Sequence, residues 1–248
     1  MKLLKFEIIL LYYKRPEIVK NSLDSIKKSS YNNWHLTFID DSGDNSFEKN
    51  LDEFGFDKSK ITYVPIMMSD DEKIKLQGSL NGKYMNDAIY LTDADIIIPI
   101  CDDDALVSDY MEKLNEYYNK NDSVVWSYCY LNFYDPYRES YLESKSESEN
   151  PALNYPYLND HKSPLNPYMC KDFSQVTFRK NALVEKEIKY LYPKNHDLDA
   201  AIFNDFFEVW GPCHFNGLRG QHKGWHEEQL GVRIRTGRGH FFSPQKYL

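Results

Sequence analysis

Three consecutive carboxylates, Asp102-Asp103-Asp104, directly follow a short apolar run over residues 96–101. A run of this length and composition is typical of a buried strand. Adjacent carboxylates at a strand end repel one another unless a cation or several hydrogen-bond donors compensate their charge. Hard divalent cations prefer oxygen ligands and in turn bind phosphate oxygens. The triplet therefore predicts a cation site or, as the alternative, a solvated acidic turn in which an aspartate caps the next helix.

Polar or aromatic side chains also follow two earlier apolar runs. The first run ends at Tyr12 and Tyr13, and the second ends at Asp40 and Asp41 within a strong turn signal. In an open α/β sheet, ligands bind beyond the carboxyl ends of the strands. We therefore expect these residues and the aspartate triplet to face one crevice. The alternatives are that the tyrosines are core aromatics and that the two aspartates form a turn and a helix cap.

Strand and helix patterns alternate up to about residue 120, which predicts an open, mixed but mainly parallel α/β sheet flanked by helices. The length of 248 residues suits one large domain. We expect strands over residues 6–11, 34–39, 61–65, 96–101, 123–133 and 173–179. We expect helices over residues 16–26, 47–54, 78–91, 106–117, 180–190 and 196–210.

Two segments lack these periodic patterns. Residues 135–172 contain several prolines and a polar, low-complexity stretch, which is typical of a flexible or functional loop. Residues 217–248 are rich in Gly, His and Arg and show little apolar periodicity. We expect this second segment to be a loop that folds over a ligand.

Composition limits the class of protein. The formal net charge of −8 argues against a general nucleic-acid binder, whose surface would be basic. The four cysteines are far apart and form no CxxC pair, which favours a reduced cytoplasmic setting and argues against a zinc site. No apolar stretch approaches the length of a membrane span. The start of the chain has no cleavage-site pattern, so we interpret it as a first strand and not as a signal peptide.

Four segments of the chain, taken together, resemble the family 2 glycosyltransferases of the GT-A fold. They occur in the family's order within roughly residues 6–120. The pattern departs from the family's "VDDGS" strand end, because Ser42 and Gly43 stand in exchanged order. The segments are residues 8–17 (opening strand and turn), residues 39–42 (second strand end), residues 82–88 with Asn86 (the helix before the metal strand) and Asp102-Asp103-Asp104 (the DxD motif).

The resemblance implies a GT-A domain over residues 1–248, with a nucleotide-sugar-binding half (1–120) and an acceptor-binding half (121–248). It also implies a nucleotide-sugar donor, usually a UDP-sugar, and Mn²⁺ or Mg²⁺ as cofactor. Carried over by position, Tyr13 would border the base and Asp40 would accept its imide N–H. The nucleotide-sugar site implied in full comprises Tyr12, Tyr13, Arg15, Asp40, Asp41, Lys83, Asp102 and Asp103.

The same resemblance implies the metal ligands. Asp104 would bind the ion directly, and Asp102 and Asp103 would address the ribose and the water shell of the ion, so Asp102 is also counted as a metal residue. Some GT-A enzymes add a histidine from the C-terminal region, and Mn²⁺ accepts imidazole together with carboxylate. His222 is our choice over His226 and His240, the alternative being a surface histidine in a loop. Arginines later in the tail could clamp a diphosphate or balance an acidic surface; they are Arg233, Arg235 and Arg238.

A transferase of this kind needs a base for the acceptor hydroxyl, normally a carboxylate. Family members place an acid early in a helix of the second half, often as Glu-Asp. Here His196-Asp197-Leu198-Asp199 occupies that place, so histidine replaces the glutamate. We favour Asp197 over Asp199 as the base. Either acid could instead be a plain first-turn residue that stabilises the helix N-terminus.

The sequence thus predicts a metal-dependent hexosyl- or N-acetylhexosaminyl-transferase of glycan biosynthesis, and the resemblance alone implies inversion. The acceptor could be a glycan, a lipid-linked molecule or a protein, and the protein could be peripheral at a membrane; oligomeric state stays open. One alternative is a nucleotidyltransferase of related fold, although no GxGxRL loop follows the first strand. The other is a catalytically silent nucleotide-sugar or glycan-binding protein, which could dispense with Asp197 and Asp199.

Overall fold

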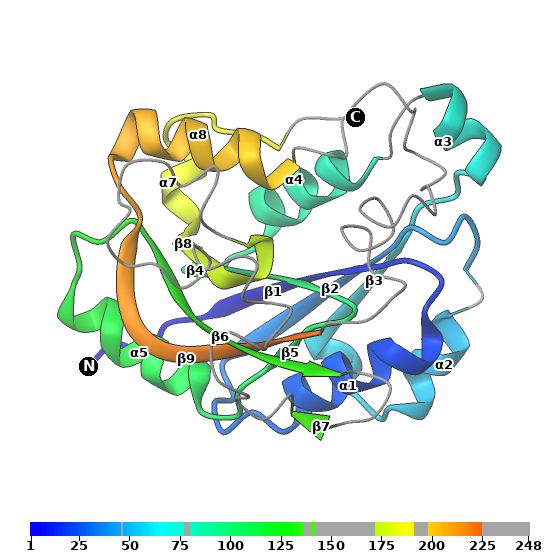
Figure 1. The fold of residues 1–248 in the computed structure, drawn as a ribbon, viewed down its shortest axis with the longest axis horizontal. Helices are drawn as coiled ribbons and strands as arrows, with labels where there is room; N and C mark the ends of the chain where they lie inside the picture. The colour runs from blue at the N-terminus through cyan, green and yellow to red at the C-terminus, as the bar shows by residue number, and fades with distance from the viewer. Residues whose placement is uncertain (46, 77–79, 136–139, 142–171, 191–197, 225–248) are drawn as a thin grey trace, which may run out of the picture.

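A computed structural model describes residues 1–45, 47–76, 80–135, 140–141, 172–190 and 198–224 (Figure 1). The strands in these ranges are β1 (Phe6–Tyr12), β2 (Trp34–Asp40), β3 (Ile61–Pro65), β4 (Ile96–Cys101), β5 (Ala105–Leu106), β6 (Trp126–Asp135), β7 (Ser140–Tyr141), β8 (Val176–Arg179) and β9 (His214–Gly224). The α-helices are α1 (Pro16–Lys27), α2 (Glu48–Glu53), α3 (Asp70–Leu76), α4 (Asn81–Leu91), α5 (Tyr110–Lys120), α7 (Lys180–Val184) and α8 (Leu198–Trp210). The 3₁₀ turns in these ranges are η1 (Lys58–Lys60) and η4 (Phe173–Gln175).

The described strands form one mixed sheet with the order β3-β2-β1-β4-β8-β6-β9-β5, and β7 pairs with β6. Strands β1 to β4 are parallel to one another. Their register aligns the carboxyl ends, because Tyr12 pairs with Asp40 and Leu11 pairs with Cys101. The residues that follow these strands therefore meet at one edge of the sheet, as the sequence predicts.

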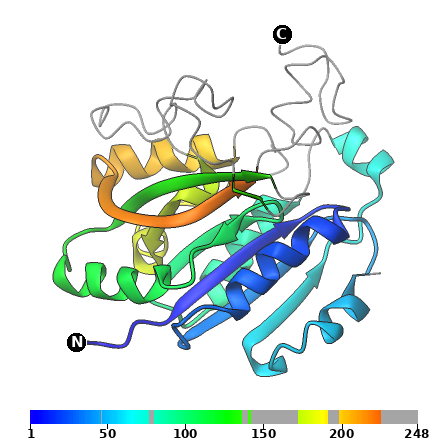
Figure 2. The same ribbon diagram turned by 60° about the horizontal axis from the view of Figure 1, so that its bottom comes forward.

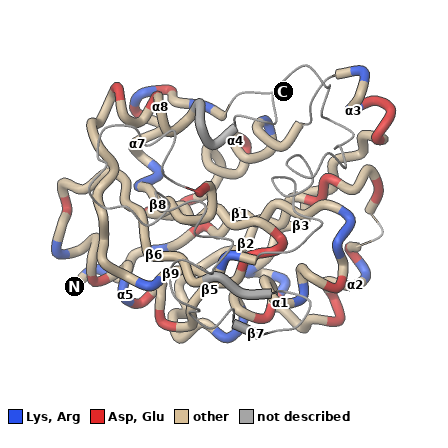
Figure 3. Tube along the Cα trace, in the orientation of Figure 1, with Lys and Arg blue, Asp and Glu red and all other residues tan. Residues whose placement is uncertain are grey.

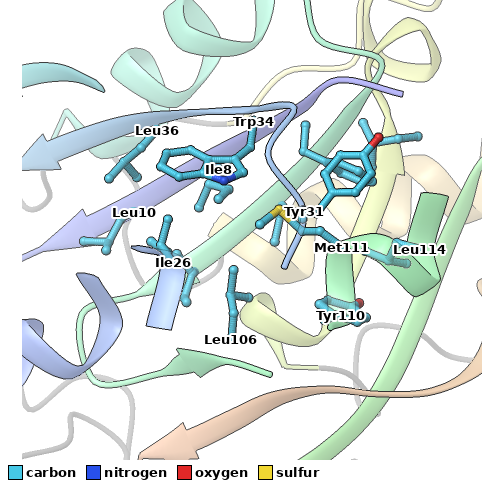
Figure 4. Close-up of a cluster of buried hydrophobic side chains, with 14 of the residues drawn as sticks. Ile8, Leu10, Ile26, Tyr31, Trp34, Leu36, Leu106, Tyr110, Met111 and Leu114 are labelled. Atoms are coloured by element: carbon cyan, nitrogen blue, oxygen red, sulfur yellow. The ribbon is translucent and has the colours of Figure 1, made fainter. Parts of the chain in front are cut away.

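Helices cover both faces of the sheet, with α1, α2 and α5 on one side and α4, α7 and α8 on the other (Figure 1). Successive residues of a strand point to opposite faces, so Ile8 packs with the α1 side and Ile9 with the α4 side. Figure 4 shows part of the cluster on the α1 side, which includes Ile8 of β1, Ile26 of α1 and Leu114 of α5. This double burial explains why β4 and, apart from Glu7, β1 are apolar runs.

Strand β9 corrects the expectation of a loop from residue 217 onward. Residues 214–224 form a strand that runs parallel to β6 and antiparallel to β5, and Figure 2 shows β6 and β9 side by side. The sequence of this strand shows little apolar periodicity. The strand is instead stabilised by backbone pairing with β6 and β5 and by close packing. A Cβ atom at Gly220 would lie only 2.5 Å from Tyr110 and from Cys129. Residues 225–248 lie outside the described part.

Other boundaries also differ from the expectations. The helix expected over residues 106–117 begins at Tyr110, because Ala105 and Leu106 pair with β9 as strand β5. The helix expected over residues 180–190 ends at Val184. Helix α3 has no counterpart among the expected elements. Most of the loop expected over residues 135–172 lies outside the described residues. Within the described ranges, no helix is long and apolar enough to cross a membrane.

Candidate functional site

The aspartate triplet lies at the carboxyl end of β4 and is buried: Asp102 is 1% exposed, Asp103 3% and Asp104 0%. The turn that presents it is fixed by Ser22 of α1, whose Oγ donates to the carbonyl oxygens of Asp102 (2.9 Å) and Asp104. A solvated acidic turn is therefore excluded. Figure 3 shows acidic and basic segments next to one another where β1 and β2 end.

Arg15, in the turn after β1, pairs with the first two aspartates. Its Nε donates to Asp102 Oδ2 at 3.2 Å, its Nη2 donates to Asp102 Oδ1, and its Nη1 donates to Asp103 Oδ2 at 3.2 Å. The backbone N–H of Tyr13 adds a bond of 3.0 Å to Asp102 Oδ2. These contacts tie the first strand end to the triplet, and both oxygens of Asp102 accept from Arg15 or Tyr13.

The third aspartate, Asp104, is held by residues of β9 and η4. Asp104 Oδ1 accepts from the backbone N–H of Gly224 at 3.1 Å, and Oδ2 accepts from Lys223 Nζ at 3.1 Å and from Ser174 Oγ. The Lys223 ammonium also lies 3.1 Å from Asp172 Oδ1. A Cβ atom at Gly224 would lie 2.0 Å from the carbonyl oxygen of Asp103, so only glycine permits this approach.

Negative charge exceeds positive charge among the described residues of this cluster. Asp102, Asp103, Asp104 and Asp172 face two cationic side chains, Arg15 and Lys223. Burial raises the pKa of Asp102 to about 6 against the effect of Arg15. Burial likewise raises the pKa of Asp104 to about 7 against the effect of Lys223, and the charge of Asp103 adds to both shifts. A further cation would relieve this excess.

The donor atoms fit a divalent ion. One carboxylate oxygen each of Asp103 and Asp104 and the sulfur of Cys101 lie within 4.8 Å of one another. The two oxygens suit Mg²⁺ or Mn²⁺. Burial raises the pKa of the Cys101 thiol well above its usual range, so the thiol stays protonated and is a weak ligand. The carboxylates would therefore hold the ion.

The raised pKa values predict a pH dependence of stability in metal-free protein. A carboxyl group whose pKa is higher in the folded than in the unfolded state binds more protons when folded, so its contribution to stability falls as pH rises. For Asp102 and Asp104 the fall extends from about pH 4 to about pH 7. Urea unfolding in EDTA between pH 4 and pH 8 is expected to show it, and Asp104→Asn should reduce it. Identical pH profiles for the two proteins would contradict the assignment.

The second strand end carries two adjacent aspartates with different surroundings. Asp40 is fully buried, and its oxygens accept from the Ser42 N–H at 2.9 Å and from the Tyr63 hydroxyl at 2.7 Å. Asp41 pairs with Lys73 of α3 at 2.8 Å and accepts from the Asn81 side chain at 3.2 Å. Asp40 therefore braces its own turn, whereas Asp41 belongs to a separate charged cluster.

The two tyrosines after β1 also differ. Tyr12 packs against Phe38 and Phe47 in the core, with ring centroids 5.4 and 4.6 Å away, which matches the alternative of a core aromatic. Tyr13 lies beside the Asp41 cluster, because the buried Lys73 ammonium is 4.9 Å from its ring centroid. The Tyr13 hydroxyl donates to Asp70 Oδ1 at 3.2 Å.

The remaining expected site residues lie elsewhere or outside the described part. Lys83 pairs with Asp87 at 2.7 Å along α4. His222 neighbours Lys223 in β9, and strand alternation directs the two side chains to opposite faces; burial lowers the pKa of His222. Asp199 lies in α8. Asp197, His226, His240, Arg233, Arg235 and Arg238 are not among the described residues.

Several residues of the site have no signal in the sequence analysis. Lys223 and Gly224 fall in the segment expected to be a loop. Asp172 is the last residue of the proline-rich segment, and Ser174 lies in the strand expected over residues 173–179. Lys73 belongs to the helix that the sequence analysis missed. The Asp-x-Ser spacing of Asp172 and Ser174, which form a capped turn, is the one available cue.

Comparisons with known proteins bear on the fold. No family model and no curated protein matches the sequence. Among solved structures, S. aureus TarS has 12% identity and a TM-score of 0.61, with 90% of this chain and 37% of that chain covered. TarS 1-349 in complex with UDP-GlcNAc has 12% identity and a TM-score of 0.61, with 91% and 60% covered. The mannosyltransferase PcManGT from Pyrobaculum calidifontis, in complex with GDP-Man and Mn²⁺, has 10% identity and a TM-score of 0.62, with 96% and 62% covered.

These likenesses span nearly all of this chain but less than two thirds of each matched chain. At such low identity they show the fold alone. The fold is a glycosyltransferase fold of the GT-A type, and the predicted fold class is confirmed.

Proposed function

We propose that the chain is a glycosyltransferase that uses a divalent cation to move a sugar from a nucleotide-sugar donor to an acceptor hydroxyl. The observation that carries the proposal is the buried Asp102-Asp103-Asp104 turn, held between Arg15 and Lys223 at the carboxyl ends of the strands. The complexes of TarS with UDP-GlcNAc and of PcManGT with GDP-Man and Mn²⁺ support a nucleotide-sugar donor for this fold. We propose a UDP-sugar, following the sequence resemblance.

The nucleotide base would lie at the end of β1 and β2. Tyr13 offers a ring face, and Asp41 with Lys73 offers a carboxylate and an ammonium beside it. The sequence-based choice for the imide N–H is Asp40, whose two oxygens already accept from Ser42 and Tyr63. Asp41 is the alternative, but its oxygens also have partners in Lys73 and Asn81, so either carboxylate would exchange a protein partner for the base.

The diphosphate would lie at the triplet. Asp103 and Asp104 would hold the ion, which when bound supplies positive charge to the leaving diphosphate. Arg15 fixes the orientation of Asp103, and Ser174 and Gly224 fix that of Asp104, before the donor arrives. Such preorganisation lowers the cost of stabilising charge in the transition state. Whether Mn²⁺ or Mg²⁺ serves better depends on the coordination number that the occupied site adopts.

The acceptor hydroxyl would lose its proton to Asp197, with Asp199 as the alternative base. Support comes from the segment that precedes them: Asn86 of α4 donates to the carbonyl oxygen of Tyr190 at 2.9 Å and accepts from its N–H at 2.8 Å. These two hydrogen bonds tie Tyr190, which precedes the two acids in the sequence, to helix α4. Attack of the deprotonated hydroxyl on the anomeric carbon, with departure of the diphosphate from the opposite face, would invert that centre.

A thermal-shift measurement with nucleotides tests the proposal. UDP is expected to raise the melting temperature in Mn²⁺ but not in EDTA, and GDP is expected to have a smaller effect. An equal shift in both conditions would show that the metal assignment is wrong, and no shift with either nucleotide would contradict the donor class. Release of UDP from a panel of UDP-hexoses and UDP-N-acetylhexosamines then separates an enzyme from a silent binding protein.

A further inference from the structure

The Lys223 ammonium contacts Asp104 at a place where a metal ion bound to Asp104 would also lie. Its ammonium lies 3.1 Å from Asp104 Oδ2 and 3.1 Å from Asp172 Oδ1, and its side chain is only 12% exposed. Ser174 donates to the same oxygen of Asp104, and Gly224 donates its backbone N–H to the other. Both oxygens of Asp104 are therefore satisfied by the protein itself.

A divalent ion at Asp104 would meet this ammonium at close range. Two cations that share one carboxylate repel each other strongly where water is excluded. A carboxylate oxygen that already accepts two hydrogen bonds also has little capacity left for a metal ion. The ion and the Lys223 ammonium therefore compete for Asp104 Oδ2 in the arrangement seen here.

We propose that Lys223 is the resident counter-cation of the site, which competes with the divalent ion for Asp104 and moves to the donor diphosphate when the ion binds. The inference rests on the function proposed above. The flexible four-carbon side chain lets the Lys223 ammonium move. The hydrogen bond from the Gly224 N–H to Asp104 keeps the end of β9 in place. The displaced ammonium keeps Asp172 as a partner and gains a second anionic partner when a diphosphate is present, so ion and nucleotide bind with positive coupling.

Mn²⁺ titration of the whole chain, followed by the electron paramagnetic resonance signal of the free ion, tests the competition. Lys223→Met is expected to bind Mn²⁺ about tenfold more tightly than the wild type without nucleotide, a size typical of coupling between sites. The same variant is expected to lose most of the gain in Mn²⁺ affinity that UDP produces in the wild type. Lys223→Arg, which keeps the charge, should behave more like the wild type than like Lys223→Met.

Lys120→Met is the matched control, because Lys120 pairs with Glu116 on the exposed face of α5 at 3.3 Å. It should leave both titrations unchanged. Equal or weaker Mn²⁺ binding by Lys223→Met would overturn the competition, even if UDP still binds the wild type and the proposed function stands. Failure of the wild type to bind any nucleotide would instead count against the proposed function. Lys223→Gln provides a second neutral variant if Lys223→Met does not melt cooperatively.

Discussion

Replacing Asp104 with asparagine is expected to lower kcat/KM for sugar transfer by roughly 10³-fold, the size found when a preorganised electrostatic group is removed from an active site. Asparagine keeps the volume of the side chain and an oxygen that accepts from Gly224 or Ser174. It lacks the negative charge that would hold the ion. The loss should therefore appear in transfer and in Mn²⁺-dependent UDP binding, and far less in folding.

The control for this variant is Asp52→Asn, because Asp52 makes an exposed ion pair with Lys58 at 3.1 Å. Its kinetics should match those of the wild type. If Asp104→Asn kept more than a tenth of the wild-type kcat/KM at saturating Mn²⁺, Asp104 could not be the carboxylate that holds the ion. The melting temperature of each variant, measured in EDTA, separates a loss of chemistry from a loss of fold.

Replacing Arg15 with methionine is expected to destabilise the fold by about 3–5 kcal/mol at pH 7, as is typical when one partner of a buried ion pair is removed. Asp102 and Asp103 are nearly inaccessible to water and would lose the guanidinium that donates to both. For a chain of this size the expected drop in melting temperature is roughly 6–20 °C. The drop should be smaller at pH 5, because Asp102, with a pKa of about 6, is then mostly protonated.

Lys58→Met provides the comparison, since exposed ion pairs contribute only about 0–1 kcal/mol. Urea unfolding at pH 5 and pH 7 gives the free energy of unfolding for each protein. A loss below about 1 kcal/mol for Arg15→Met would mean that other donors or water compensate the two carboxylates. A larger loss at pH 5 than at pH 7 would contradict the pKa assignment for Asp102.

Strands β1 and β4 were predictable because burial on both faces produces apolar runs, such as residues 8–11 and 96–100. Strand β9 was not, since Gly220 and Gly224 stand where packing leaves no room for a side chain. Its pairing with β6 and β5 is decided by contacts distant in sequence. Predictions from propensity and periodicity use only the local sequence and take no account of such contacts.

For the candidate site, the shared sheet edge was predictable, but the direction of individual side chains and the contribution of β9 were not. Residues that follow parallel strands meet at one edge, so the sequence brings Tyr13, Arg15 and the triplet together. Which of two neighbouring residues faces the site depends on strand pleat and turn geometry. Tyr12 thus packs in the core while Tyr13 lies beside Lys73. Lys223 was missed because its strand was missed.

The position of β4 in the sheet has a consequence for synthesis on the ribosome. Ile96 and Ile97 pair on one side with β1, which emerges early, and on the other with Phe178 and Arg179 of β8, which emerge much later. Until then the nascent chain presents an unpaired, isoleucine-rich edge, the kind of surface that pairs with other chains. Translation that slows before residue 180 would prolong this exposure, and chaperones that bind extended apolar segments would protect it.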